Sequence, residues 1–153
     1  RVEIVDRSNN VGQREVTAAN TGEYHHYAGT ADKSTFELFK DGTSEGTTAE
    51  AHAIEGDIQD VDIGERSDGG FNYDGILSDC AMWSVVLSDA EINALSNGIP
   101  PKVIRPDSIL GYWPLYGSHS PEPDWSGNGE NGTITGTAKA EHAPVQLLQM
   151  YMP

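Results

Sequence analysis

Apolar and polar residues alternate with a period of two along several short stretches of the chain. The clearest is residues 35–40, which is followed directly by Asp41-Gly42. That pair is typical of a tight hairpin turn because both residues tolerate a positive φ, so a return strand is expected through residues 43–50. Further strands are predicted at residues 2–5, 14–19, 58–65, 71–87, 109–115 and 133–137, with a loop at 7–13.

A single segment has the pattern of a helix. Ser88 and Glu91 have the spacing of a capping box, in which two side chains satisfy free N–H groups at the start of a helix. Ile92 and Leu95 follow at the i, i+3 spacing of one apolar face. Gly98 can adopt the left-handed conformation that ends a helix, and two prolines come shortly after it. The sequence therefore predicts a short helix near residues 88–97.

Composition and charge limit the classes of function. The chain has 153 residues, enough for one domain with its own core, and it has 17 glycines, many of them in Asn-Gly, Asp-Gly and Ser-Gly pairs that favour an all-β fold. The net charge of −15 disfavours nucleic acid as a partner, since phosphates would be repelled. No apolar run approaches the ~20 residues that span a bilayer, so no membrane insertion is expected. The lone Cys80 is expected to be a small buried apolar side chain.

Three stretches together resemble the laminin-G-like, concanavalin A-like lectin and glucanase family. They are "EYHHYAGTADKSTFELFKDG" (23–42), "FNYDGILSDCAMWSVVLSDAEINAL" (71–95) and "YWPL" (112–115) with its following "DWSGNGENGT" (124–133). The resemblance implies an all-β fold, a two-sheet antiparallel jelly-roll β-sandwich. The arrangement of the C-terminal stretch after such a domain also resembles a type found in tailed-phage and prophage proteins, which implies a virion or extracellular location.

The order of these stretches is unusual for that family, because the "YWPL" strand normally comes first. Two explanations are open: N-terminal strands of a longer protein are missing, or the late strand fills a vacant position in the sheet. An open sheet edge exposes unpaired N–H and C=O groups, which favours completion by some segment. We therefore expect a laminin-G-like sandwich over residues 1–98 and an extension over 99–153 that adds a strand or strands to the same sandwich and ends in a tail.

The sequence does not favour catalysis. Glucanases with this fold place two glutamates and an aspartate on one strand in a Glu-x-Asp-x-x-Glu pattern, and this pattern is absent. Glu122 and Asp124 flank Pro123, which disfavours a central strand. No Gly-x-Ser-x-Gly motif is present either. His25 and His26 are adjacent and so point to opposite faces of a strand. They are not expected to share a metal ion; one is expected to pack inward with its ring nitrogen hydrogen-bonded.

Candidate ligand-binding residues gather in the glycine-rich stretch after "YWPL". Asp124, Ser126 and Asn128 stand at alternate positions, as the first oxygen ligands of a calcium loop do. Asp124 is the candidate calcium ligand, and the alternative is that it and Asn128 hydrogen-bond their own turn. Asp60 and Asp62 form a second, weaker calcium candidate.

Exposed aromatic side chains are candidates for stacking on sugar rings. Trp83 and Trp113 lie in apolar runs and are expected in the core, whereas Trp125 lies in the glycine-rich loop. Trp125, Asp124, Tyr73 and Asn128 are thus the predicted ligand-binding residues. The expected function is a non-catalytic recognition module for a glycan or cell-surface polymer. The alternative is a virion structural protein that contacts neighbouring subunits, partly through its apolar tail at 145–153.

Overall fold

The computed structural model describes part of the chain, namely residues 2–5 and 11–14 by their backbone, and 22–32, 34–49, 61–64, 73–116 and 120–136 in full. The chain divides into two compact units. The first contains residues 1–61 and 86–97, and the second contains residues 62–85 and 98–153. The chain thus enters the second unit, returns to the first for one helix, and leaves it again.

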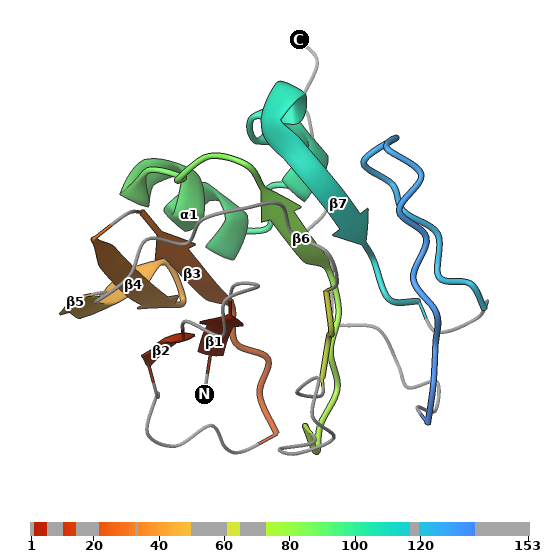
Figure 1. Ribbon diagram of the computed structural model, residues 1–153, viewed down its shortest axis with the longest axis horizontal. Helices are drawn as coiled ribbons and strands as arrows, with labels where there is room; N and C mark the ends of the chain where they lie inside the picture. Colours follow the sequence, from red (N-terminus) through yellow and green to blue (C-terminus); the bar gives the residue numbers. More distant parts are fainter. Residues whose placement is uncertain are drawn as a thin grey trace, which may run out of the picture. The chain divides into compact units, whose positions relative to one another are not determined.

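The strands described in the first unit form two small antiparallel sheets (Figure 1). β1 (Val2–Val5) pairs with β2 (Val11–Arg14), and β4 (Thr35–Lys40) lies between β3 (Tyr27–Ala31) and β5 (Thr43–Ala49). The strand predicted at residues 2–5 and the hairpin at 35–49 are confirmed. β2 lies in the predicted loop, because pairing with β1 outweighs the local composition. Residues 15–19 of the strand predicted there lie outside the described residues.

The β4–β5 hairpin turns at Asp41 and Gly42, whose φ values of 51° and 77° are both positive, as a two-residue hairpin loop requires. Asp41 also ties the turn to the start of β3: its backbone N–H donates to the His26 carbonyl, and its carboxylate accepts from the His26 N–H at 2.9 Å. The pairing of β4 with β5 shifts register after Leu38, where Gly46 takes a φ of 103°. This bulge bends the hairpin.

The apolar core of the first unit is centred on β4. Phe36 and Leu38 are fully buried, as their alternation predicts, and Phe39, at the opposite parity of β4, is buried as well. Over the described residues of this unit, Ile92 and Leu87 are the other buried apolar side chains. Burial of each such side chain stabilises the fold by about 1.5–3 kcal/mol.

The predicted helix is confirmed as α1 (Asp89–Ser96). Ser88 is its N-cap and forms the predicted capping box: the Glu91 carboxylate accepts from the Ser88 N–H at 2.8 Å, and the Glu91 N–H donates to Ser88 Oγ. Ile92 is its buried residue, and Gly98, with a φ of 85°, follows the C-cap residue. α1 contacts β5 within the first unit.

The two adjacent histidines differ from the prediction in one respect. The hydrogen-bonded ring nitrogen belongs to His25, whose Nδ1 lies 2.8 Å from Asp41 Oδ2. The buried ring nitrogen belongs to His26: its Nδ1 is buried and has no hydrogen-bond partner among the described residues. Burial lowers the pKa of His26, although the nearby Asp41 carboxylate opposes the shift. The neutral ring is therefore favoured.

The second unit contains an antiparallel pair of strands, β6 (Cys80–Trp83) and β7 (Ile109–Trp113). Two short 3-10 turns, η1 (Pro101–Val103) and η2 (Pro106–Ser108), lead into β7. The late "YWPL" strand therefore pairs with the "DCAMW" segment. The division of the chain into domains at residue 98 stays a prediction.

Three strand predictions are wrong over all or part of the residues described, and the one at 71–87 holds only where β6 lies. Residues 73–79 of the predicted 71–87 strand are not in a strand, and Asp79 has a φ of 53°, which a strand does not allow. Residues 61–64 have no strand either, and 58–60 lie outside the described residues. Near residue 133 the structure has a single bridge between Glu122 and Gly132. Glycines at 64, 75 and 136 weaken all three segments as strands.

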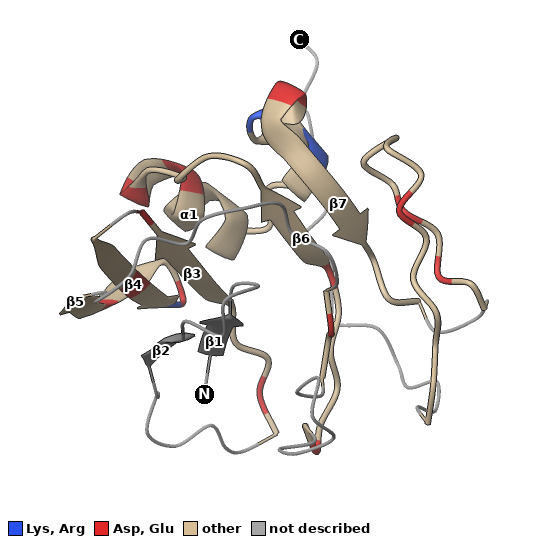
Figure 2. Ribbon diagram, in the orientation of Figure 1, with Lys and Arg blue, Asp and Glu red and all other residues tan. Residues whose placement is uncertain are grey.

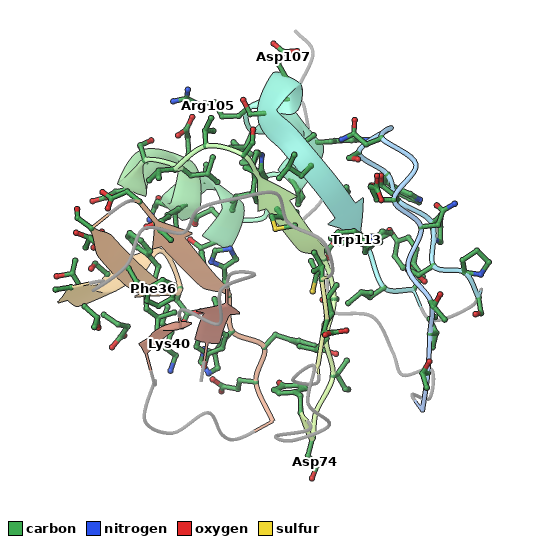
Figure 3. The ribbon with its side chains drawn as sticks, in the orientation of Figure 1. Phe36, Lys40, Asp74, Arg105, Asp107 and Trp113 are labelled. Atoms are coloured by element: carbon green, nitrogen blue, oxygen red, sulfur yellow. The ribbon has the colours of Figure 1, made fainter. Side chains whose placement is uncertain are left out.

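Trp113 is buried in the second unit, as predicted, with 8% of its surface exposed. Figure 3 labels it on β7. Its indole lies over Gly111, where an added Cβ would be 2.6 Å from Cζ2, so β7 needs a glycine at that position. Its Nε1 donates to the Glu130 carbonyl at 2.6 Å. Trp83 is half-buried, and its Nε1 donates to the Ile104 carbonyl. Cys80 is half-buried, and burial raises the pKa of its thiol to about 11.

Candidate functional site: an aromatic surface on a glycine-rich loop

The loop of residues 120–136 is closed at its base by a two-way backbone bridge. Glu122 and Gly132 exchange N–H···O hydrogen bonds of 2.7 and 2.9 Å. The Glu122 side chain is 2% exposed, and its carboxylate accepts from the Tyr116 N–H. The loop is thus attached to the segment that leaves β7, and its tip is formed by residues 124–130.

Asp124 organises this tip. Its carboxylate accepts five hydrogen bonds at 2.7–3.1 Å. The donors are the N–H groups of Tyr112, Ser126, Gly129 and Glu130, and the Ser126 hydroxyl. Partial burial alone would raise the pKa of Asp124, but these donors outweigh it and hold the pKa below its usual range. The ionised carboxylate therefore holds the loop in shape.

Two further contacts attach the tip to β7. The Asn128 side-chain amide donates to the carbonyls of Ile109 at 2.8 Å and Leu110 at 3.0 Å. The Trp125 N–H donates to the Tyr112 carbonyl at 2.7 Å. Because both ends of the tip bond to the strand, the backbone beneath Trp125 is fixed, and its side chain is presented from a rigid base.

The Trp125 indole is 45% exposed and contacts two tyrosines edge-on. Its centroid lies 6.2 Å from that of Tyr112 and 5.5 Å from that of Tyr116, with interplanar angles of 87° and 65°. Tyr112 is buried, and its hydroxyl donates to Asp79 Oδ1 at 2.7 Å, whereas Tyr116 is 39% exposed. The Lys102 ammonium lies 5.9 Å from the indole centroid. We call Trp125, Tyr116 and Lys102 the aromatic surface.

The aromatic surface suits a ligand that has an apolar face and polar edges. An exposed indole held by neighbouring rings offers a rigid contact area at little cost in side-chain entropy. A pyranose ring meets this requirement, because its C–H face stacks on an aromatic ring and its hydroxyls point outward. Trp125 and Tyr116 are steeply inclined to each other, so they cannot both lie flat on one planar polymer surface. The geometry fits one ring stacked on the indole.

The structure brings together three of the four predicted ligand-binding residues. Asp124, Trp125 and Asn128 share the loop tip, but Asp124 and Asn128 use their side chains to hold the loop. As direct ligand contacts, they stay predictions. Tyr73 is 53% exposed and lies elsewhere: its N–H donates to the Gly64 carbonyl. In Figure 3, its neighbour Asp74 lies at the opposite end of the second unit from Asp107, which is in η2 just before β7.

Sequence reasoning missed Lys102 and gave Tyr116 no special role. Lys102 precedes Trp125 by more than twenty positions, and nothing in "PPKV" signals a contact with an indole. Tyr116 was one of several aromatics near the end of a predicted strand. The signal that could have pointed to it is its place directly after "YWPL", where the chain leaves the sheet beside the loop.

Calcium binding at Asp124 stays a prediction, and it would require hydrogen bonds of the loop to break. Both carboxylate oxygens already accept hydrogen bonds, so a cation would have to replace donors that shape the loop. Asp62 is exposed, and Asp60 lies outside the described residues. Over the residues described, no group of three or more His, Cys, Asp or Glu side chains is arranged to hold a metal ion.

The fold and the loop define a β-sandwich domain that presents an aromatic surface. Residues 2–93 match the family model described as the concanavalin A-like lectin/glucanases superfamily, and the chain belongs to this family. The match includes the first of the three resembling stretches and nearly all of the second, and it ends before the third. The predicted fold class, an all-β antiparallel sandwich with one short helix, is confirmed.

A search of curated proteins found no match, and neither did a search of solved structures. In the part of the chain that the structure describes, no helix has the length and apolar character needed to cross a membrane.

Proposed function

We propose that the chain is a non-catalytic recognition module that binds glycan through the aromatic surface. The observation that carries this proposal is the exposure of Trp125 on a loop whose shape is set by five hydrogen bonds to one carboxylate. Membership in a family of lectins and glucanases supports a sugar as the ligand. An outer location, on a virion or outside the cell, is part of the proposal because it gives the module access to surface polymers.

The carboxylates near Trp125 support binding rather than hydrolysis. Glycosidases need two carboxyl groups that flank the scissile bond, one as acid and the other as base or nucleophile. Glu122 is buried and accepts from the Tyr116 N–H, and Asp124 is saturated by its five donors. Neither is available to protonate a leaving group above the indole. The proposal therefore assigns recognition, and no bond cleavage, to this loop.

Trp125→Ala tests the proposal. An aromatic residue at the centre of an interface contributes about 2 kcal/mol or more, so binding should weaken roughly 30-fold. A glycan array identifies a ligand, and isothermal titration then measures its affinity for the wild type and the variant. Trp125→Phe should retain part of the affinity, because a flat apolar ring remains.

Tyr73→Ala is the matched control, since it removes an exposed aromatic of the same unit away from the loop. Its affinity should equal that of the wild type. If Trp125→Ala and Tyr73→Ala bind the glycan as tightly as the wild type does, or if no glycan binds, the proposed function is wrong. Unchanged far-ultraviolet dichroism of both variants would show that the fold is intact.

Assembly with neighbouring subunits is the second candidate function, favoured by a set of exposed apolar side chains. Tyr73 and Ile76 are 53% and 46% exposed, and Ile63 and Leu77 are each 37% exposed. They lie close together, because the Tyr73 N–H bonds to Gly64 and the Leu77 side chain lies beside the same glycine. Exposed apolar clusters of this kind often mark protein contacts.

Sizing with light scattering tests the assembly role. If the chain is an oligomer through this cluster, Tyr73→Ser combined with Ile76→Ser should convert it to monomers, whereas Trp125→Ala should not. A wild-type chain that is monomeric at high concentration would contradict self-assembly through these residues.

A further inference from the structure

Lys102 is held next to the exposed indole by the turn that precedes β7. Pro101 is buried, and the N–H groups of Val103 and Ile104 donate to the carbonyls of Pro100 and Pro101 at 2.9 and 3.0 Å. The Ile104 carbonyl in turn accepts from Trp83 Nε1 at 2.7 Å. The backbone on both sides of Lys102 is therefore anchored, while its side chain is exposed and extends to the Trp125 ring.

The cation beside Trp125 stands out in a strongly acidic chain. Over the described residues of the second unit, the basic side chains are Lys102 and Arg105, which fall in one short segment (Figure 2). One carboxylate of the loop tip, Asp124, has its charge stabilised by five donors. Glu130 is the exposed carboxylate of the tip. Charges farther away are screened beyond about 8 Å at physiological ionic strength.

The position of the ammonium matches an acidic substituent of a stacked sugar. A lysine ammonium is a compact charge on a flexible stem, so it can leave the indole and follow an anion. At 5.9 Å from the centroid, it sits near the outer limit of a cation–π contact, which is worth only about 0.5–1 kcal/mol at an exposed site. A carboxylate or sulfate carried by a ring stacked on Trp125 would offer Lys102 a stronger, charge-assisted partner.

We propose that the glycan bound by the aromatic surface is acidic, with a pyranose ring stacked on Trp125 and its carboxylate or sulfate group paired with Lys102. This inference rests on the proposed function and specifies its ligand class. Stacking supplies the affinity shared by neutral and acidic sugars, and Lys102 supplies the preference for the acidic one.

The test compares a short oligogalacturonate with its fully methyl-esterified form, which has the same rings without the charge. A sulfated glycosaminoglycan oligosaccharide and its desulfated form distinguish sulfate from carboxylate. We expect the wild type to bind one acidic form more tightly than its neutral counterpart. Lys102→Gln should lower the affinity for that acidic form by about 3- to 10-fold. Lys102→Glu should weaken it further. Added salt should lower the affinity for the acidic ligand and leave the affinity for the neutral one unchanged.

Lys40→Gln is the control, because it makes the same change in net charge on the first unit. It should leave the preference unchanged. Equal affinity for acidic and neutral forms, with Trp125→Ala still weakening the binding of both, would overturn the acidic preference and leave glycan binding standing. Binding of neither form of either pair, or binding that ignores Trp125, would overturn the proposed function together with this inference.

Discussion

Trp113→Ala is expected to lower the unfolding free energy of the second unit by about 3–5 kcal/mol, the usual cost of removing a buried tryptophan. Trp113 is 8% exposed, so alanine leaves a cavity over Gly111. The substitution also removes the Nε1–H that bonds to the Glu130 carbonyl, which attaches the loop tip to β7. Urea unfolding followed by circular dichroism measures the loss.

Two variants separate the contributions to this loss. Trp113→Phe keeps most of the apolar volume but lacks the indole donor, so it should lie between the wild type and Trp113→Ala. Trp125→Ala removes a tryptophan that is 45% exposed and should change the unfolding free energy by less than about 1 kcal/mol. If Trp113→Ala were no more destabilising than Trp125→Ala, Trp113 would not be a core residue and the pairing of β6 with β7 would need another explanation.

The elements predicted correctly are those whose signals are local. The β4–β5 hairpin follows from alternation and from Asp41-Gly42, whose positive φ values are intrinsic to those residue types. Helix α1 follows from the Ser88–Glu91 capping box, which needs no tertiary contact to be recognised. In both cases the residues that specify the element also form its contacts.

The prediction of a strand over residues 71–87 failed at residues 73–79 because apolar content was used as a proxy for burial. Tyr73, Ile76 and Leu77 are exposed. Asp79 has a positive φ that turns the chain, and its N–H donates to the Pro114 carbonyl. Where a strand begins here is decided by its partner β7, which lies more than twenty residues further along the chain. Alternation alone does not contain this information.

The candidate site was predicted in part for a similar reason. The spacing of Asp124, Ser126 and Asn128 is common to calcium loops and to turns stabilised by their own side chains, so the sequence left both open. The structure adds amide donors from outside the motif, notably the Tyr112 N–H, which no spacing within the loop could predict. The exposure of Trp125 could be inferred from its glycine-rich surroundings, but the approach of Lys102 depends on how the turn before β7 packs.

Asp124→Ala is expected to disorder the loop tip and to lower the unfolding free energy by about 2–3 kcal/mol, since hydrogen bonds to charged groups are worth ~1.5–3 kcal/mol each and partial exposure to water reduces their sum. Glycan binding should fall as far as in Trp125→Ala, because Trp125 loses its fixed base. Asp124→Asn should behave similarly, since its amide group would face N–H donors where the carboxylate accepts. Asp74→Ala, at an exposed aspartate of the same unit, should have little effect.

Acid provides an independent test of the same carboxylate. The folded protein holds the pKa of Asp124 below its unfolded value, so the charge contributes stability at pH values above the unfolded pKa, and this contribution is lost as the pH falls through the folded pKa. The difference in unfolding free energy between the wild type and Asp124→Asn should therefore be largest near neutral pH and should shrink as the pH falls through the lowered pKa of Asp124. A difference that stays constant across this range would mean that the five donors do not depend on the charge, and the loop would owe its shape to packing around Trp113 instead.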